Sequence, residues 1–128
     1  MFDPIPNVSR RDVLRIVNRD FPAVDQVQVI ALLDEYGTQQ GDAEPHRVHV
    51  AVLKLSGGSI GKLREHVVLA KGDYRDVLAP AEYPKFWELG LVGVEDLTAK
   101  ERRQLQEDDW RQYQVWLEDG TEAPKGRA

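Results

Sequence analysis

The sequence predicts an all-α protein, a compact bundle of five or six helices whose neighbours run mostly antiparallel. Three observations lead to this fold class. Apolar residues recur at helical spacing through most of the chain, whereas strict alternation of apolar and polar residues is nowhere sustained. Prolines, glycines and capping residues divide the chain into segments of helix length. The loops between these segments span only a few residues, and short loops favour antiparallel neighbours.

Length and composition limit the number of domains. The chain has 128 residues, of which 41% are hydrophobic and 30% charged. This length is typical of one domain. We expect a single helical domain over residues 1–120 and a flexible tail at residues 121–128, which have the composition of a frayed terminus.

Two helices are expected in the first third of the chain. Ser9 and Asp12 have the spacing of a capping box, and Pro22 ends the helix that they begin. The second helix is expected at residues 23–36, with Gly37 as its stop signal. Its apolar residues nearly encircle it, so we expect it to be buried on more than one side.

The third and fourth helices are expected at residues 45–55 and 59–72, joined by a glycine-containing turn. The third is apolar on two opposite faces, which predicts a central helix sandwiched between others. The fourth has one apolar stripe, formed by Ile60, Leu63, Val67 and Ala70.

The segment after the fourth helix has mixed signals. Asp73 restarts a short helix, and Pro80 is expected to break or kink it because proline cannot donate the helical hydrogen bond. Residues 83–87 are interpreted as an aromatic connector that packs beneath the last helix. Residues 89–94, with two glycines, are interpreted as a loop.

The last helix has the clearest start signal in the chain. Thr98 and Glu101 form a capping box, and the helix is expected to run over residues 99–118. Gly120 follows as a stop signal. One stripe of this helix is aromatic and apolar, comprising Trp110, Tyr113 and Leu117, with Leu105 and Trp116 at its flanks.

Composition also excludes several classes of function. No apolar run approaches the ~20 residues that span a bilayer. The chain begins without the basic and apolar regions of a signal peptide, and we expect a cytoplasmic protein. It has 17 basic against 22 acidic residues and a net charge of −5, which disfavours general nucleic-acid binding. Cysteine is absent, which excludes disulfides, Cys zinc sites and thiol nucleophiles.

Patterns that indicate catalysis are sparse. Residues 57–61 read GGSIG, which has the spacing of the GxSxG motif, but the element before them is expected to be a helix and not the strand that this motif requires. The neighbouring carboxylates Asp73 and Asp76 lie where helix caps are needed, which explains them without catalysis. The sequence therefore favours a non-enzymatic protein, and no cofactor is expected.

His46 and His49 are the candidate metal ligands. Their spacing places two imidazoles on one helix face, but zinc needs three or four ligands. His66, Glu44 or Asp73 would complete a site only if the fold brought them close. The alternative is that the two histidines border a helix–helix contact. This pair supports an alternative hypothesis of a small-ligand or metal-binding protein.

A helix-turn-helix is a further alternative. The expected helices at residues 45–55 and 59–72 have this outline, with a glycine turn between them. The second helix carries Lys62, Arg64 and Lys71, but also Glu65. This interpretation predicts a nucleic-acid-associated protein, although the net negative charge of the chain disfavours nucleic-acid binding.

Two sets of residues form a candidate interaction surface. Arginines recur every four residues on the first helix, where they would meet an acidic partner or simply be solvated; they are Arg11, Arg15 and Arg19. Aromatic residues, which dominate interface hot spots but also fill cores, gather in the second half; they are Trp87, Trp110, Tyr113 and Trp116. The leading hypothesis is a protein-interaction or accessory protein that binds a protein partner or associates as a homodimer.

Two segments carry a resemblance to a known family. Residues 50–58 read VAVLKLSGG and residues 73–84 read DYRDVLAPAEYP. In these segments the chain resembles a family of small uncharacterised bacterial helical proteins. The resemblance implies a bacterial source and a small helical protein, and it implies no activity and no functional residue.

Overall fold

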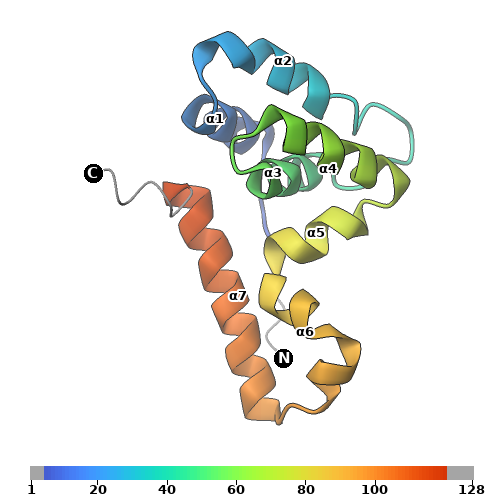
Figure 1. The fold of residues 1–128 in the computed structure, drawn as a ribbon, viewed down its shortest axis with the longest axis vertical. Helices are drawn as coiled ribbons and strands as arrows, with labels where there is room; N and C mark the ends of the chain where they lie inside the picture. Colours follow the sequence, from blue (N-terminus) through green and yellow to red (C-terminus); the bar gives the residue numbers. More distant parts are fainter. Residues whose placement is uncertain (1–4, 121–128) are drawn as a thin grey trace.

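The computed structural model describes residues 5–120, and within them the protein is all-helical (Figure 1). The helices are α1 (Arg10–Asp20), α2 (Ala23–Leu33), α3 (Pro45–Ser56), α4 (Ile60–Gly72), α5 (Arg75–Glu82), α6 (Pro84–Glu95) and α7 (Ala99–Asp119). The all-α prediction is confirmed. The predicted tail at residues 121–128 lies outside the described residues. No helix in the described part of the chain is both long and apolar enough to cross a membrane.

The predicted number of five or six helices was too low because of α6. The expected connector at residues 83–87 and the expected loop at residues 89–94 together form this helix. It is interrupted at Gly90, whose φ of 79° and ψ of 169° lie outside the helical region. Gly90 adopts this positive φ without the steric cost that a side chain would add.

Local capping places several helix starts where the sequence predicts them. Thr98 Oγ1 accepts the backbone N–H of Glu101 at 3.0 Å, and Glu101 Oε1 accepts that of Thr98 at 2.9 Å. Asp12 Oδ2 accepts the backbone N–H of Ser9 at 2.9 Å, and this bond is the main cause that lowers the pKa of Asp12. Asp73 Oδ1 likewise accepts the N–H of Arg75 at 3.0 Å.

The core is centred on α3, which packs against α1, α4 and α5. Both of its apolar faces are buried, as the sequence predicts. Its buried residues are Val48, His49, Val50, Ala51, Val52, Leu53 and Ser56.

The prediction for α2 was wrong in two respects. The helix ends at Leu33 rather than at Tyr36, and the Tyr36 hydroxyl instead donates to Ala43 O at 2.7 Å in the following loop. Only one side of α2 is buried, against α1 and α4. Val24 and Val27 are 88% and 81% exposed, because α2 lies at the edge of the molecule with no helix over its outer face (Figure 1).

The helices do not form one compact bundle. Figure 1 shows α1–α5 packed together, with α6 and the long α7 extending away from them. The last turn of α7 returns to α1, where Arg19 donates to Trp116 O at 3.1 Å and Leu117 O at 3.0 Å. The Arg19 guanidinium also lies 5.1 Å from the centre of the Trp116 ring. Arg19 therefore adds a side-chain donor at the α7 C-terminus, where Trp116 O also accepts the backbone N–H of Gly120 at 2.7 Å.

Candidate interaction surface

The start of α6 is held by a buried carboxylate of α7. Asp109, which is only 2% exposed, accepts the backbone N–H of Lys85 at 2.9 Å and of Phe86 at 3.0 Å. These donors belong to the first turn of α6, where helical N–H groups lack an internal partner. Burial raises the pKa of Asp109, although both hydrogen bonds act in the opposite direction. Asp109 thus caps a helix from which it is remote in sequence.

The end of α6 is held by a second side chain of α7. Arg102 Nη2 donates to Val94 O at 3.1 Å. Just before α6, Gln112 Nε2 donates to Glu82 O at 3.3 Å. Side chains of α7 therefore anchor the backbone of α6 at both ends.

Side chains of α6 contribute little to the core. Among the side chains of this helix that the structure describes, Val94 is the one buried hydrophobic residue. The start of α6 lies against α7, as the sequence predicts for residues 83–87, but Trp87 is 57% exposed and Val92 is 76% exposed. We call the exposed large hydrophobic residues of this segment the α6 apolar surface; they are Tyr83, Trp87, Leu89 and Val92.

The two halves of α6 meet closely at a glycine. A Cβ atom added to Gly93 would lie 2.7 Å from Leu89 Cγ, a separation that real Cβ contacts do not show. Leu89 therefore rests on the backbone of the second half of the helix, across the interruption at Gly90. This contact fixes the position of Leu89 relative to the second half of the helix.

The structure separates the aromatic residues that the sequence grouped together. Trp87 lies on the surface, and Trp110 is partly buried. Tyr113 is fully buried and Trp116 is 8% exposed. The ring centre of Tyr113 lies 6.4 Å from that of Trp110 and 6.3 Å from that of Trp116. This part of α7 forms an aromatic row in which Tyr113 and Trp116 are buried and Trp110 is partly buried, which leaves Trp87 as the strongly exposed tryptophan.

The arginines of α1 have different environments. Arg11 is exposed, and Arg15 lies 3.5 Å from Asp12 in an ion pair within the same helix. Arg19 pairs with Asp20 at 2.8 Å while it caps α7. Of the three, Arg11 has the side chain most available to a partner.

His46 and His49 lie on neighbouring turns, with ring centres 6.5 Å apart. His49 is 4% exposed, and its Nε2–H donates to Tyr36 O at 2.8 Å. Its buried Nδ1 has no hydrogen-bond partner in the described part of the chain, and burial lowers the pKa of the ring. No cluster of three or more potential metal ligands occurs within residues 5–120. The metal hypothesis stays a prediction that rests on these two histidines.

The helix-turn-helix outline corresponds to α3 and α4. Lys62, Arg64 and Glu65 are exposed on α4, whereas Lys71 lies 3.7 Å from Glu35 in an ion pair. The exposed face of α4 is therefore mixed in charge. Nucleic-acid binding by this face also stays a prediction.

Comparison with known proteins finds no relative of this chain. No family model matches the chain, and no curated protein or solved structure matches it. The resemblance of residues 50–58 and 73–84 to small bacterial helical proteins stays a prediction.

Proposed function

We propose that this protein is a non-enzymatic interaction protein that binds a protein partner, a second copy of itself included, through the α6 apolar surface. The observation that carries the proposal is Trp87, which is 57% exposed on a helix anchored at both ends by another helix. Tryptophan is among the residues most enriched at interface hot spots.

The anchoring of α6 favours binding. A segment that must be ordered on association loses part of the binding free energy to that ordering. Asp109 and Arg102 already fix the backbone of α6 in the free protein. The exposed side chains of Trp87 and Val92 are thus presented on a preorganised backbone.

The surroundings of this patch match the usual anatomy of an interface. Such interfaces have an apolar centre and a polar, solvated rim. Exposed charged residues flank the apolar side chains along α6 and at its end; they are Lys85, Glu88, Glu95 and Asp96. Burial of a Val or Leu side chain contributes about 1.5–3 kcal/mol, so a few such residues supply a substantial binding free energy.

Site-specific photo-crosslinking tests this proposal directly. A photoreactive phenylalanine analogue at position 87, in the organism that makes the protein, should give a discrete crosslinked species. The matched control is position 68, because Val68 on α4 has nearly the same exposure, 59%. Mass spectrometry identifies the crosslinked protein, which is either a second copy or another chain.

Once the crosslinked protein is identified, its affinity for the wild type and for variants can be measured. Trp87→Ala should weaken association with the identified protein about 30-fold or more, as expected of a hot spot. Val68→Ala should leave the affinity unchanged. Crosslinks of equal yield at positions 87 and 68, or a discrete partner whose affinity Trp87→Ala does not change, would contradict the proposal.

A further inference from the structure

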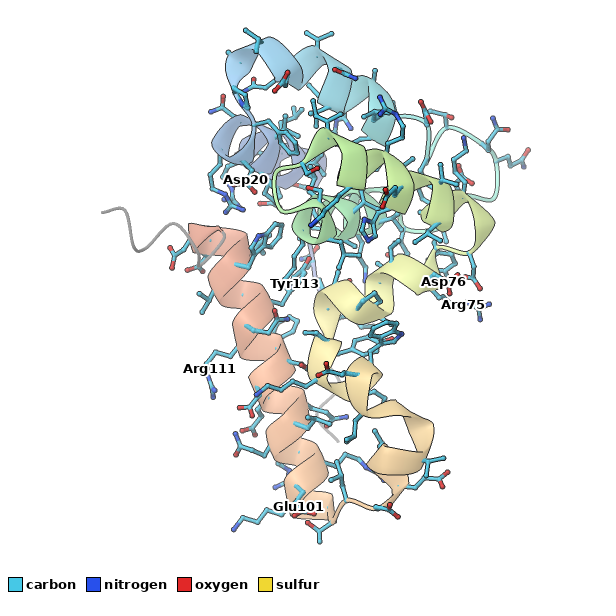
Figure 2. All side chains as sticks on the ribbon, viewed as in Figure 1. Asp20, Arg75, Asp76, Glu101, Arg111 and Tyr113 are labelled. Carbon is cyan, nitrogen blue, oxygen red and sulfur yellow. The ribbon has the colours of Figure 1, made fainter. Side chains whose placement is uncertain are left out.

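A groove of about 590 Å³ lies where the end of α3 and the start of α6 meet α7. Lys54 and Gly57 line it from α3 and the following turn, Lys85 lines it from α6, and Arg111 and Trp116 line it from α7. Arg111 projects outward from α7 in Figure 2. A volume of this size is ordinary for a small-molecule site. The groove shares none of the four residues of the α6 apolar surface, and Lys85, which lines the groove, lies at the rim of that surface.

The groove is positively charged in an acidic protein. Its ionisable lining residues are three cations, Lys54, Lys85 and Arg111, and one carboxylate, Asp108, which sum to two positive charges. The whole chain carries −5. Asp108 lies 3.4 Å from the Lys85 ammonium and 3.3 Å from the Arg111 guanidinium. Its charge is therefore already shared by two of the three cations.

Lys54 is the cation left without a counter-ion. It is partly buried, and its ammonium has no carboxylate within 4 Å among residues 5–120. The acid that acts on it electrostatically is Asp109, whose two oxygens are hydrogen-bonded to the α6 backbone. Burial lowers the pKa of Lys54, as expected for an ammonium that has lost part of its hydration. An anion in the groove would restore the missing charge partner.

Helix structure explains part of this arrangement without a ligand. Lys54 lies in the last turn of α3, where a cation interacts favourably with the partial negative charge of the helix end. That interaction accounts for a basic residue at this position. It does not account for a groove that is also lined by two further cations and by the exposed Val115.

The other lining residues define the body of the ligand. Val115, which is 48% exposed, gives the groove an apolar wall beside the cations, whereas Trp116 lines it with little free surface because its ring is buried and lies under Arg19. We propose that this groove binds a small amphipathic anion, with an apolar ring system against Val115 and one carboxylate, sulfonate or phosphate group paired with the Lys54 ammonium. Lys85 and Arg111 add long-range attraction for the same charge.

A pair of matched dyes tests the proposal on the full chain. The anionic probe is 1-anilinonaphthalene-8-sulfonate, and N-phenyl-1-naphthylamine is the same ring system without the charge. Titration calorimetry of both dyes is compared for the wild type, Lys54→Met and Lys62→Met. Methionine keeps an apolar stem of similar length, and Lys62 on α4 is an exposed lysine outside the groove.

We expect the sulfonate to bind the wild type in a saturable manner. Lys54→Met should weaken it about tenfold or more, as expected for loss of a hydrogen bond to a charged group. The same variant should leave the neutral dye unchanged, and Lys54→Arg should restore most of the sulfonate affinity. Lys62→Met should change neither dye.

Several results would overturn the proposal. These are absence of saturable sulfonate binding to the wild type, an equal loss in Lys54→Met and Lys62→Met, or an equal loss for both dyes. Trp87→Ala separates this site from the proposed interaction surface. It should leave the sulfonate affinity unchanged, and loss of binding in that variant would place the dye on α6 and refute the groove site.

Discussion

Removal of one partner from the buried ion pair between α3 and α5 should destabilise the protein strongly. Arg47 donates to both carboxylate oxygens of Glu82, from Nε and from Nη2, each at 2.7 Å. The Glu82 residue is 6% exposed, and the Arg47 side chain is 17% exposed. The bidentate bond to Glu82 is the main cause that raises the pKa of Arg47. In a buried pair of this geometry, each charged group has lost water and is stabilised by its partner instead.

The expected magnitude follows from the burial of the pair. Loss of one partner of a buried pair costs about 3–5 kcal/mol. The lower value applies to Glu82→Leu, because Glu44 lies 3.6 Å from the Arg47 guanidinium and partly compensates it. About 3 kcal/mol should lower the unfolding midpoint by roughly 10 °C in a domain of this size. Arg47→Met should cost at least as much, since it leaves the Glu82 carboxylate buried alone.

A double-mutant cycle makes the argument refutable. Urea denaturation followed by circular dichroism gives the free energy of unfolding for the wild type, both single variants and Arg47→Met/Glu82→Leu. The double variant should lose less stability than either single variant, because no uncompensated charge remains. Additive losses, or single losses below about 1 kcal/mol, would refute the reasoning. Arg75→Met is the matched control, because Arg75 makes a bidentate pair with Asp73 although its side chain is 76% exposed. Figure 2 shows Arg75 at the surface, and its loss should barely move the midpoint.

Three further substitutions have distinct outcomes. Tyr113→Phe should raise the thermal midpoint, because within the described residues the buried hydroxyl has no hydrogen-bond partner and its desolvation costs about 1–3 kcal/mol; a lower midpoint would contradict this. Burial depresses the pKa of His49 below 6.5, so the unfolded chain takes up the proton first and wild-type stability should fall as the pH drops below this value. In urea titrations at several pH values, the free energy of unfolding of His49→Gln should fall less steeply with decreasing pH than that of the wild type. The control His66→Gln should show the wild-type pH dependence. The same slope in both variants would refute the assignment of this pH dependence to His49. Asp109→Ala should speed amide hydrogen exchange at residues 85–94 while α3 keeps its protection, and a uniform increase over the whole chain would count against a local capping role.

Local chemistry made much of the fold predictable. The capping box of Thr98 and Glu101 joins residues three apart, so its hydrogen bonds are set by helix geometry alone. The two apolar faces of α3 predicted its central position because apolar side chains on opposite sides require partners on opposite sides. The same reasoning failed for α2. Its apolar outer face is exposed, since the pattern predicts a need for burial but cannot supply a neighbouring helix.

The candidate sites depended on contacts between residues remote in sequence. A glycine-interrupted segment with no local cap was interpreted as connector and loop, yet Asp109 caps it from α7. From the sequence, Asp109 is only one of several acidic residues on the last helix, and nothing local indicates that it caps α6. The groove likewise combines Lys54 of α3 with Arg111 of α7, which no spacing rule connects.

The sequence by itself determined the helical class, most helix starts and the central position of α3. Each of these depends on residues within one or two turns of each other. Only the tertiary structure decided that α6 is a helix with an exposed tryptophan, that Arg47 pairs with Glu82, and that Lys54 lacks a counter-ion. The physical reason is that desolvation and hydrogen bonding of these groups depend on which helices pack together, and a linear pattern carries no such information.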